Sequence, residues 1–446
     1  MASFWCELAW LGGTAATPRV LVQTDGELIT NVFTGMSCPP DAVRLAGLTV
    51  PGMANAHSHA FHRALRGRTQ IGTGSFWTWR DQMYTAAARL DPDSYFRLAR
   101  AVYGEMVLAG VTTVGEFHYL HHGPGGVPYD EPNAMGEALA AAAAEAGLRI
   151  TLLDTCYLSS GFGAPPNEVQ QRFSDGDALA WAARATAASR LHSATCRTGA
   201  SIHSVRAVPP EAMAIVVDWR AAHGAVLHAH VSEQKAENEQ CIDAYGLTPT
   251  ALLAERGALD GAFTAVHATH LAAADIGLYG AHGCTICMCP TTERDLADGI
   301  GPALSLRDAG ARLSLGTDSH ALIDLFEEAR AVELDQRLAS QVRGSHDAPS
   351  LLRAATEHGH ASLGWAEAGR IEVGMLADLV SLRLDTVRTA GASAATALET
   401  AVFAASAADV HHVVVGGRVV VAGGEHRTLD VATELSASIA HVMGER

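Results

Sequence analysis

The sequence has 446 residues, of which 48% are hydrophobic and 18% are charged, and its formal net charge is −17. This composition is typical of a globular protein with a large core and gives no sign of disorder. The acidic balance argues against a partner that is nucleic acid or an anionic membrane surface, although a local group of arginines can still attract an acidic small molecule. No apolar run reaches the roughly 18 residues that a membrane-spanning helix needs.

The first 50 residues contain short β-like pieces, among them FWCELAWL, RVLVQTDGELITNV and AGLTV. From residue 51 to 369, apolar strand-like runs alternate with Ala-rich helical stretches such as NAMGEALAAAAAEAG. About eight such repeats predict an α/β fold, a (β/α)8 TIM-like barrel. Residues 370–446 return to β-like sequence before a terminal helix. Because chain ends often lie close together, we expect residues 1–50 and 370–446 to form one small composite β-sandwich domain.

The stretch PGMANAHSHAFHR, residues 51–63, follows the apolar run LAGLTV and contains three histidines. In an extended strand, residues two apart point to the same face, so His57 and His59 are expected to project side by side. Two neutral imidazoles aimed at one point are suited to binding a metal ion. The alternative is that these histidines are ordinary polar residues of a surface loop, and the rest of the chain must decide between the two.

Further polar residues stand at the carboxyl ends of later strand-like runs, where a barrel places its active site. In chain order they include Tyr119, His203, Arg206, His230, Glu233, His267 and Asp318. Histidines followed by a late aspartate are the ligand types of a metal-dependent hydrolase. Taken singly, each residue has a plainer interpretation, such as a buried tyrosine or a surface arginine. The hypothesis therefore rests on the order of the whole set.

Three cysteines, Cys284, Cys287 and Cys289, lie close together in CTICMCP and by themselves suggest a second metal site. No second cysteine pair stands at the spacing of a zinc ribbon, so we expect small buried thiols on an apolar strand. The spacing of all eight cysteines does not look like a secreted disulfide framework. Together with an N-terminus that lacks a basic segment, this predicts a cytoplasmic protein with reduced thiols.

Eight motifs occur in order along the chain: HSHAFHRA, SFWTWR, EFHYLHH, HSVRAV, HVSEQ, VHATH, CPTTE and GTDSH. The set resembles the amidohydrolase superfamily, in its aminohydrolase branch, and within it the formimidoylglutamate deiminase family. The resemblance covers essentially the whole chain. It implies hydrolysis of N-formimino-L-glutamate to N-formyl-L-glutamate and ammonia in histidine degradation, by a homodimer that holds one divalent metal ion. Zn²⁺ is the expected ion, although Fe²⁺ or Mn²⁺ would accept the same ligands.

The same resemblance implies roles for the residues that carry the chemistry. The metal ligands it implies are His57, His59, His230 and Asp318. A metal in such a site lowers the pKa of water from 15.7 to about 7, which turns water into a nucleophile. Glu233 would then act as general acid and base, and His267 would stabilise the attacking group or the intermediate. Asp318 would also accept a proton as ammonia leaves.

Substrate contacts also follow from the resemblance, at Arg80, Tyr119, His203 and Arg206. The two carboxylates of the substrate need fixed cationic partners, and an arginine offers a bidentate fork that a lysine lacks. The family pattern has glutamine where this chain has His62, so His62 or water would replace that contact.

Two other functions stay open. One is another aminohydrolase of the same superfamily that acts on a purine, pyrimidine or triazine ring, for which aromatic stacking and amide groups would suit better than two arginines. The other is a barrel that binds a ligand without catalysis, which the loss of Glu233 or of a metal ligand would support. All of these residues are present.

Overall fold

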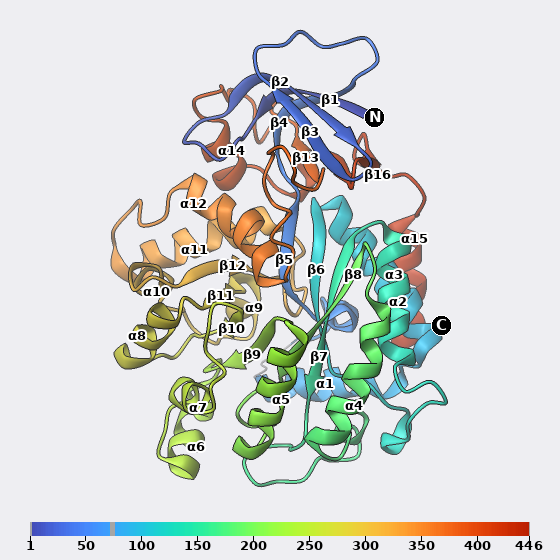
Figure 1. Cartoon of the computed structure of the whole chain (residues 1–446), viewed down its shortest axis with the longest axis vertical. Helices are drawn as coiled ribbons and strands as arrows, with labels where there is room; N and C mark the ends of the chain where they lie inside the picture. Colours follow the sequence, from blue (N-terminus) through green and yellow to red (C-terminus); the bar gives the residue numbers. More distant parts are fainter. Residues whose placement is uncertain (1, 72–75, 446) are drawn as a thin grey trace.

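The computed structural model describes residues 2–71 and 76–445. Figure 1 shows a barrel surrounded by helices and a smaller β-rich part that contains strands from both ends of the chain. Within the described residues, each part is built on an eight-stranded sheet. The predicted α/β barrel with a β-domain from both chain ends is therefore confirmed. The division of the chain at residues 50 and 369 stays a prediction.

The barrel sheet follows the chain order from its first strand to its last, and each strand is parallel to its neighbours. Its strands are β5 (Met53–Ser58), β6 (Val111–His118), β7 (Arg149–Cys156), β8 (Cys196–Ile202), β9 (Leu227–Val231), β10 (Phe263–His267), β11 (Thr285–Met288) and β12 (Arg312–Leu315). Most strand positions are buried, as expected for parallel strands that are covered on both faces.

The first and last strands meet where the barrel closes. An isolated parallel bridge joins Ser58 to Asp318, three residues beyond β12. Around it, the Asp318 amide donates to the His57 carbonyl at 3.0 Å, and the His59 amide donates to the Asp318 carbonyl at 3.3 Å. The side chain of Asn55 donates to Thr317 Oγ1 at 2.7 Å, one layer deeper. The backbone closure of the barrel thus brings two distant histidine and aspartate motifs into contact.

The connections between barrel strands are mostly helical. These helices are α1 (Phe76–Arg89), α2 (Pro92–Leu108), α3 (Ala134–Ala146), α4 (Ala178–Ala188), α5 (Pro210–His223), α6 (Lys235–Tyr245), α7 (Pro249–Glu255), α8 (Ala273–His282), α9 (Pro290–Asp295) and α10 (Ala303–Asp308). After β12 come α11 (Leu325–Ser340), α12 (Ala348–Arg353), a π-helical turn (Ala354–His358) and α13 (Gly359–Ser362).

Local sequence explains where several of these helices begin and end. At the start of α2, the Asp91 side chain accepts from the Ser94 amide at 2.8 Å while Ser94 Oγ accepts from the Asp91 amide at 2.9 Å. This reciprocal pair satisfies two amides that the helix leaves free, and Pro92 favours the first helical turn. The Ala-rich α3 ends at Gly147, whose φ of 82° needs a residue without a side chain.

The second sheet joins the two ends of the chain. Its strand order is β16 (Glu425–His426), β15 (Arg418–Ala422), β14 (Val410–Val415), β13 (Leu379–Leu382), β4 (Val43–Pro51), β1 (Ala2–Ala9), β2 (Thr17–Asp25) and β3 (Leu28–Phe33). The junction is the antiparallel pair β4–β13, in which Pro51 lies opposite Leu379. β4 leads directly into β5, so this sheet is tied to the first strand of the barrel.

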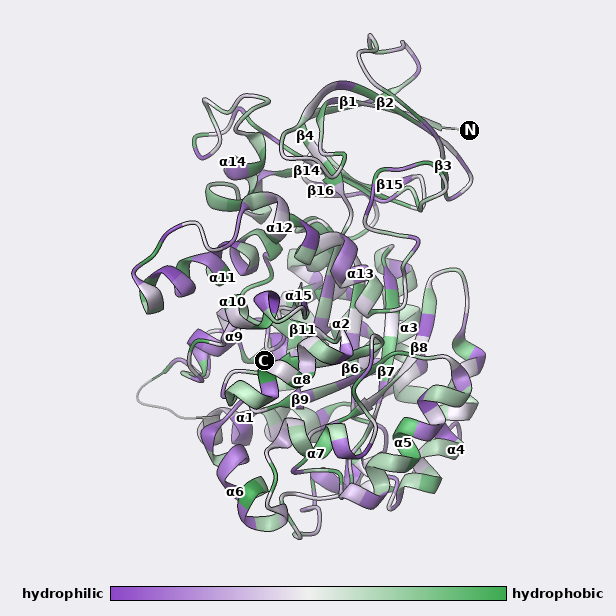
Figure 2. Ribbon diagram, turned by 60° about the vertical axis from the view of Figure 1, so that its left-hand side comes forward, coloured by the Kyte–Doolittle hydropathy of each residue, from purple (hydrophilic) through white to green (hydrophobic). Residues whose placement is uncertain are grey.

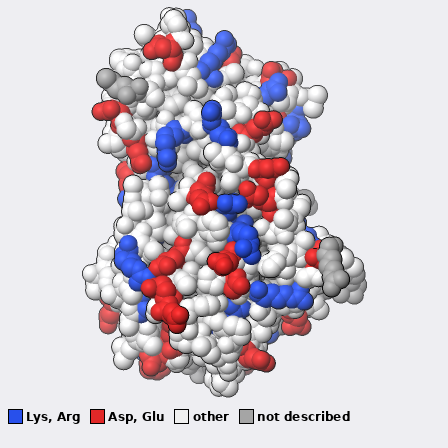
Figure 3. All heavy atoms as spheres, turned by 90° about the vertical axis from the view of Figure 1, so that its right-hand side faces the viewer, with Lys and Arg blue, Asp and Glu red and all other residues white. Residues whose placement is uncertain are grey.

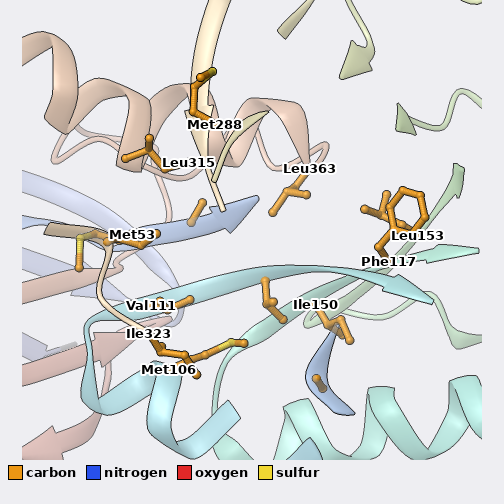
Figure 4. Packing of buried hydrophobic residues seen from close by; sticks show 14 of the residues in the cluster. Met53, Met106, Val111, Phe117, Ile150, Leu153, Met288, Leu315, Ile323 and Leu363 are labelled. Carbon is orange, nitrogen blue, oxygen red and sulfur yellow. The ribbon is translucent and has the colours of Figure 1, made fainter. Parts of the chain in front are cut away.

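Apolar side chains from different barrel strands form one hydrophobic core. Figure 4 shows part of this core, to which β5 contributes Met53, β6 Phe117, β7 Ile150, β11 Met288 and β12 Leu315. Each of these side chains is buried. Burial of one such side chain is worth about 1.5–3 kcal/mol. In Figure 2 several outer helices, α11 among them, carry both hydropathy colours, as a helix with one buried face does.

Near the other end of the chain, α14 (Ala397–Phe403) precedes β14, and α15 (Val431–Met443) packs on α2 of the barrel. Arg100 of α2 bridges Glu145 at 2.8 Å and Glu434 of α15 at 2.9 Å. The face in Figure 3 carries charges of both signs in close proximity. Among the described residues, no helix has the length and apolar content that crossing a membrane requires.

Candidate active site

Polar side chains converge at the carboxyl ends of the barrel strands. His57 lies on β5 and His59 directly after it, His230 is on β9, His267 ends β10, and Asp318 follows β12. The backbone is unusual here, because His267 and Asp318 have positive φ angles of 69° and 41°. Such conformations cost on the order of 1–3 kcal/mol for a residue with a side chain, and they persist only where surrounding contacts enforce them.

Four buried side chains form a compact cluster that could hold a metal ion: His57, His59, His230 and Asp318. One ligand atom from each lies within 4.8 Å of all the others. His230 Nε2 is 3.1 Å from His57 Nε2 and 3.4 Å from His59 Nε2. Asp318 Oδ1 is 3.2 Å from His57 Nε2 and 3.4 Å from His59 Nε2.

Hydrogen bonds behind the cluster fix the tautomers of two imidazoles. His59 Nδ1 lies 3.0 Å from the Phe117 carbonyl oxygen, and His230 Nδ1 lies 2.9 Å from the His203 carbonyl oxygen. Because a carbonyl oxygen only accepts, both Nδ1 atoms carry the proton, and both Nε2 atoms present a lone pair. Burial lowers the pKa of His59 and His230 well below the usual range, which keeps both rings neutral. Three neutral imidazoles and one carboxylate fit a divalent cation.

Glu116 on β6 braces the His-x-His segment from behind. Its carboxylate accepts from Ser58 Oγ at 2.7 Å and from the Ala60 amide at 2.7 Å, on either side of His59. Burial raises the pKa of Glu116 to about 7, although these two hydrogen bonds oppose the shift. The motif EFHY contains this glutamate, but its position before the histidine gave no reason to assign it a supporting role.

A second group of charges adjoins the cluster. His267 Nε2 lies 3.8 Å from Glu233 Oε1 and 3.8 Å from Asp318 Oδ2, and its Nδ1 lies 3.4 Å from Glu293 Oε1. Although burial disfavours its charged form, the carboxylates of Glu233, Glu293 and Asp318 raise the pKa of His267 well above its usual range. Burial raises the pKa of Glu233, and the positive charges of His267 and Arg206 oppose that shift.

Arg206 is surrounded by acidic side chains. Its Nε is 3.3 Å from Glu237 Oε2, and its Nη2 is 3.9 Å from Glu233 Oε2. Glu237 is fully buried on α6, where it also accepts from the Ser232 amide at 3.2 Å. The carboxylates of Glu233 and Glu237 therefore partly balance the positive charge of the Arg206 guanidinium.

One cavity collects the predicted residues. It is lined by every predicted site residue except His57, namely His59, His62, Arg80, Tyr119, His203, Arg206, His230, Glu233, His267 and Asp318. His62 Nε2 lies 2.9 Å from the Tyr119 hydroxyl. Besides Tyr119, four aromatic side chains line the cavity: Trp79, Tyr84, Tyr157 and Phe173. The cavity thus combines two arginine side chains with aromatic side chains.

Several of these neighbours are absent from the sequence-based set. Glu293 lies in the motif CPTTE and Glu237 stands four residues after Glu233, so each had a local signal that was not used. Tyr84 and Tyr157 had no such signal, because neither is next to a recognised motif residue. The cysteines Cys284, Cys287 and Cys289 are buried free thiols, as expected.

The barrel and the His57–His59–His230–Asp318 cluster, here called the metal-type cluster, define the class of protein to which the chain belongs. A model of the amidohydrolase family matches residues 48–420, and the chain is a member of that family. The cluster and the family together indicate that the protein is a hydrolase that uses a divalent metal ion.

The chain is also similar to individual known proteins. The chain is 36% identical to the formimidoylglutamate deiminase of Pseudomonas aeruginosa, over 100% of this chain and 99% of that protein. It is 30% identical to a 5-methylthioadenosine/S-adenosylhomocysteine deaminase of Natronomonas pharaonis, over 94% and 93% of the two chains. The crystal structure of an amidohydrolase from Brucella melitensis superposes with a TM-score of 0.93 at 32% identity, covering 99% of this chain and 100% of that one.

Proposed function

We propose that the protein hydrolyses N-formimino-L-glutamate to N-formyl-L-glutamate and ammonia. The observation that carries this proposal is a single cavity lined by three members of the His–His–His–Asp cluster, His59, His230 and Asp318, together with two arginines, Arg80 and Arg206. A substrate with two carboxylates and a hydrolysable formimino group matches both halves of that cavity. The full-length similarity to a formimidoylglutamate deiminase supports the same reaction.

The proposed metal ligands are His57, His59, His230 and Asp318, with Zn²⁺ as the proposed ion. Imidazole nitrogen and carboxylate oxygen are ligand types that Zn²⁺ accepts, so these four side chains would suit it. Such an ion, when bound, supplies the Lewis acidity that makes water a nucleophile near neutral pH.

In the proposed mechanism, protein groups move the protons. Glu233 takes a proton from the attacking water and delivers it to the terminal formimino nitrogen, which must leave as ammonia. Its carboxylate is held beside His267, which stabilises negative charge that develops on the attacking oxygen. Asp318 accepts the remaining hydroxyl proton as the carbon–nitrogen bond breaks, and this second proton passes to the departing nitrogen, which leaves as ammonia. The oxygen of water stays on the carbon as the formyl oxygen and replaces the terminal nitrogen, which leaves as ammonia.

Substrate orientation is assigned to the other cavity residues. We propose that Arg80 and Arg206 bind different carboxylates, while Tyr119 and His203 contact the substrate between them. His62 lies beside Tyr119 and takes the place of the glutamine in the family pattern. Binding energy from these remote contacts positions the formimino carbon over the cluster.

A second candidate is deamination of a purine derivative. The aromatic lining of the cavity and the 30% identity to a 5-methylthioadenosine/S-adenosylhomocysteine deaminase favour it. The two arginines of the cavity weigh against it, because a neutral base or nucleoside has no carboxylate to offer them and S-adenosylhomocysteine has only one.

Ammonia release by the metal-loaded protein separates the two candidates. The substrates to compare are N-formimino-L-glutamate, 5-methylthioadenosine, adenosine, guanine and cytosine, with metal analysis of the same sample. We expect kcat/KM for the formimino compound to exceed that for every ring compound by at least about 10³-fold, since a charge-matched site rejects unmatched substrates strongly. A ring compound that is turned over faster would refute the proposal.

The family resemblance also leads us to propose a homodimer that acts in the cytoplasm. Sedimentation of the metal-loaded protein at micromolar concentration tests the oligomeric state, and a monomer would contradict it.

A further inference from the structure

Gln170 holds a fixed position beside two tyrosines that line the cavity, Tyr84 and Tyr157. It begins the short 3-10 helix η3 (Gln170–Phe173), and its side chain is buried. The Asn167 amide donates to Gln170 Oε1 at 3.0 Å, and the Gln170 amide donates to Asn167 Oδ1 at 2.9 Å. The oxygen of the Gln170 amide group is thereby directed toward Asn167, and its nitrogen is directed away.

The nitrogen of that amide group meets two phenols. Gln170 Nε2 donates to the Tyr84 hydroxyl at 2.9 Å and to the Tyr157 hydroxyl at 2.7 Å. The side-chain nitrogen of glutamine can donate two hydrogen bonds and cannot accept one. Both phenol oxygens are therefore acceptors in this arrangement. Each phenol still has one hydrogen of its own to donate.

Gln170, Tyr84 and Tyr157 form a hydrogen-bonded trio. At least one of the two phenolic hydrogens must point to an acceptor outside this trio. If one phenol donates to the other, the second has no acceptor left within the trio. Both tyrosines line the cavity, and burial raises the pKa of each, so both stay protonated. The trio therefore offers a neutral O–H donor to whatever occupies the cavity.

The surroundings of the trio favour an anionic occupant. The Arg80 guanidinium carbon lies 5.6 Å from the centre of the Tyr84 ring, and Arg206 lines the same cavity. Arg206 is already paired with buried Glu237 and lies near Glu233. A carboxylate that approaches Arg206 must compete with these two acids, so a neutral donor that adds attraction without adding a further charge is needed.

We propose that Tyr84 and Tyr157 form a carboxylate subsite in this cavity and that Gln170 is the residue that positions them. The ligand class is a small dicarboxylate, and the subsite donates phenolic hydrogen bonds to the carboxylate that Arg206 faces. The inference deepens the proposed function and rests on it for the identity of the substrate.

Hydroxyl-deletion variants test the subsite directly. Tyr84→Phe and Tyr157→Phe keep the rings that pack near Phe173 and remove only the donors. The probe is binding of N-formyl-L-glutamate to the metal-loaded protein by calorimetry, and we expect Kd to rise at least about fivefold in one variant or both. KM for N-formimino-L-glutamate should rise in parallel while kcat stays within about twofold. Tyr279→Phe is the matched control, because its hydroxyl contacts Thr250 on α7.

A third variant tests the positioning role. Gln170→Glu has nearly the same shape, but its carboxylate accepts hydrogen bonds, so it would draw the phenolic hydrogens away from the cavity. We expect a loss of N-formyl-L-glutamate affinity at least as large as that of the tyrosine variants. Gln170→Leu should lose less, because it leaves the phenols free to turn. If Gln170→Glu fails to fold, the two tyrosine variants decide.

Each outcome separates this inference from the proposed reaction. Turnover of N-formimino-L-glutamate by the wild type, with Kd unchanged within twofold in both tyrosine variants, would overturn the subsite alone. Absence of turnover, with binding of N-formyl-L-glutamate that depends on the tyrosines, would overturn the reaction and keep the dicarboxylate subsite. Absence of both turnover and binding in the wild type would overturn both.

Discussion

Gly316, one residue beyond β12, controls the position of His57. A Cβ atom added at Gly316 would lie 2.7 Å from His57 Cβ and 3.0 Å from both Cys287 Sγ and the His57 amide nitrogen. The nearest of these atoms belong to a strand and cannot swing away as the tip of a flexible side chain can. Ordinary contacts between carbon atoms are about 3.5 Å or longer, so Gly316→Ala must move the His57 and Gly316 segments apart by about 0.8 Å.

That displacement is large compared with what a metal site tolerates. Metal–ligand distances are reproduced within about 0.2 Å in well-formed sites, and loss of a supporting contact typically costs about 10–100-fold in affinity. We therefore expect Gly316→Ala to weaken metal binding at least about tenfold. Forcing an extra carbon into a packed interior also costs about 1–3 kcal/mol of stability.

The assay is metal retention during dialysis against graded chelator, followed by thermal unfolding of the metal-loaded protein. The control is Gly277→Ala on α8, because a Cβ atom there meets nothing within 4 Å. Alanine in an exposed helix position is favoured over glycine by about 0.5–1 kcal/mol, so the control should be slightly more stable and should retain metal normally. Metal affinity of Gly316→Ala within threefold of wild type would refute the reasoning, since His57 would then not be a ligand held by this contact.

Three further variants test the remaining roles. His230→Ala should lose both metal and activity, whereas His228→Ala, whose ring faces the Ser362 carbonyl, should keep its metal; a fully metallated His230→Ala protein would contradict the ligand assignment. Glu233→Gln should keep its metal and lose at least about 10²-fold in kcat, and near wild-type turnover would exclude the proton-transfer role. Arg206→Met should lower kcat/KM for N-formimino-L-glutamate by about 2–4 kcal/mol with unchanged metal content, and a loss under about threefold would reject the carboxylate contact.

The parts of the site that follow short-range rules could be predicted from the sequence. His57 and His59 share a face because strand side chains alternate, and His230, His267 and Asp318 were placed together because parallel strands end at one face of a barrel. Both rules use only the local pattern and the order of strands. In the folded chain the Asp318 carboxylate lies 3.2 Å from the His57 ring and 3.4 Å from the His59 ring, as these rules require.

Other parts depend on contacts that leave no local pattern. Gln170 lies 86 residues from Tyr84 along the chain, and the segment that carries it has no regular strand or long helix. Its contacts with Tyr84 and Tyr157 form only when η3, α1 and the end of β7 pack together. The supporting position of Glu237 similarly depends on where α6 directs its first turn. Side chains that orient other side chains are therefore harder to find from sequence than those that carry the chemistry.

The position of the metal-type cluster links the chemistry to the closure of the barrel. Asn55 and Thr317, which join β5 to the segment after β12, are 262 residues apart in the sequence. Within the described part of the chain, an isolated backbone bridge and a few flanking hydrogen bonds connect these two edges, whereas pairings of several residues join the other neighbouring barrel strands. The cluster spans the same junction, because His57 and His59 come from one edge and Asp318 from the other. Binding a cation there would strengthen a junction that has few backbone hydrogen bonds, since the free energy of ligation is then also free energy of closure.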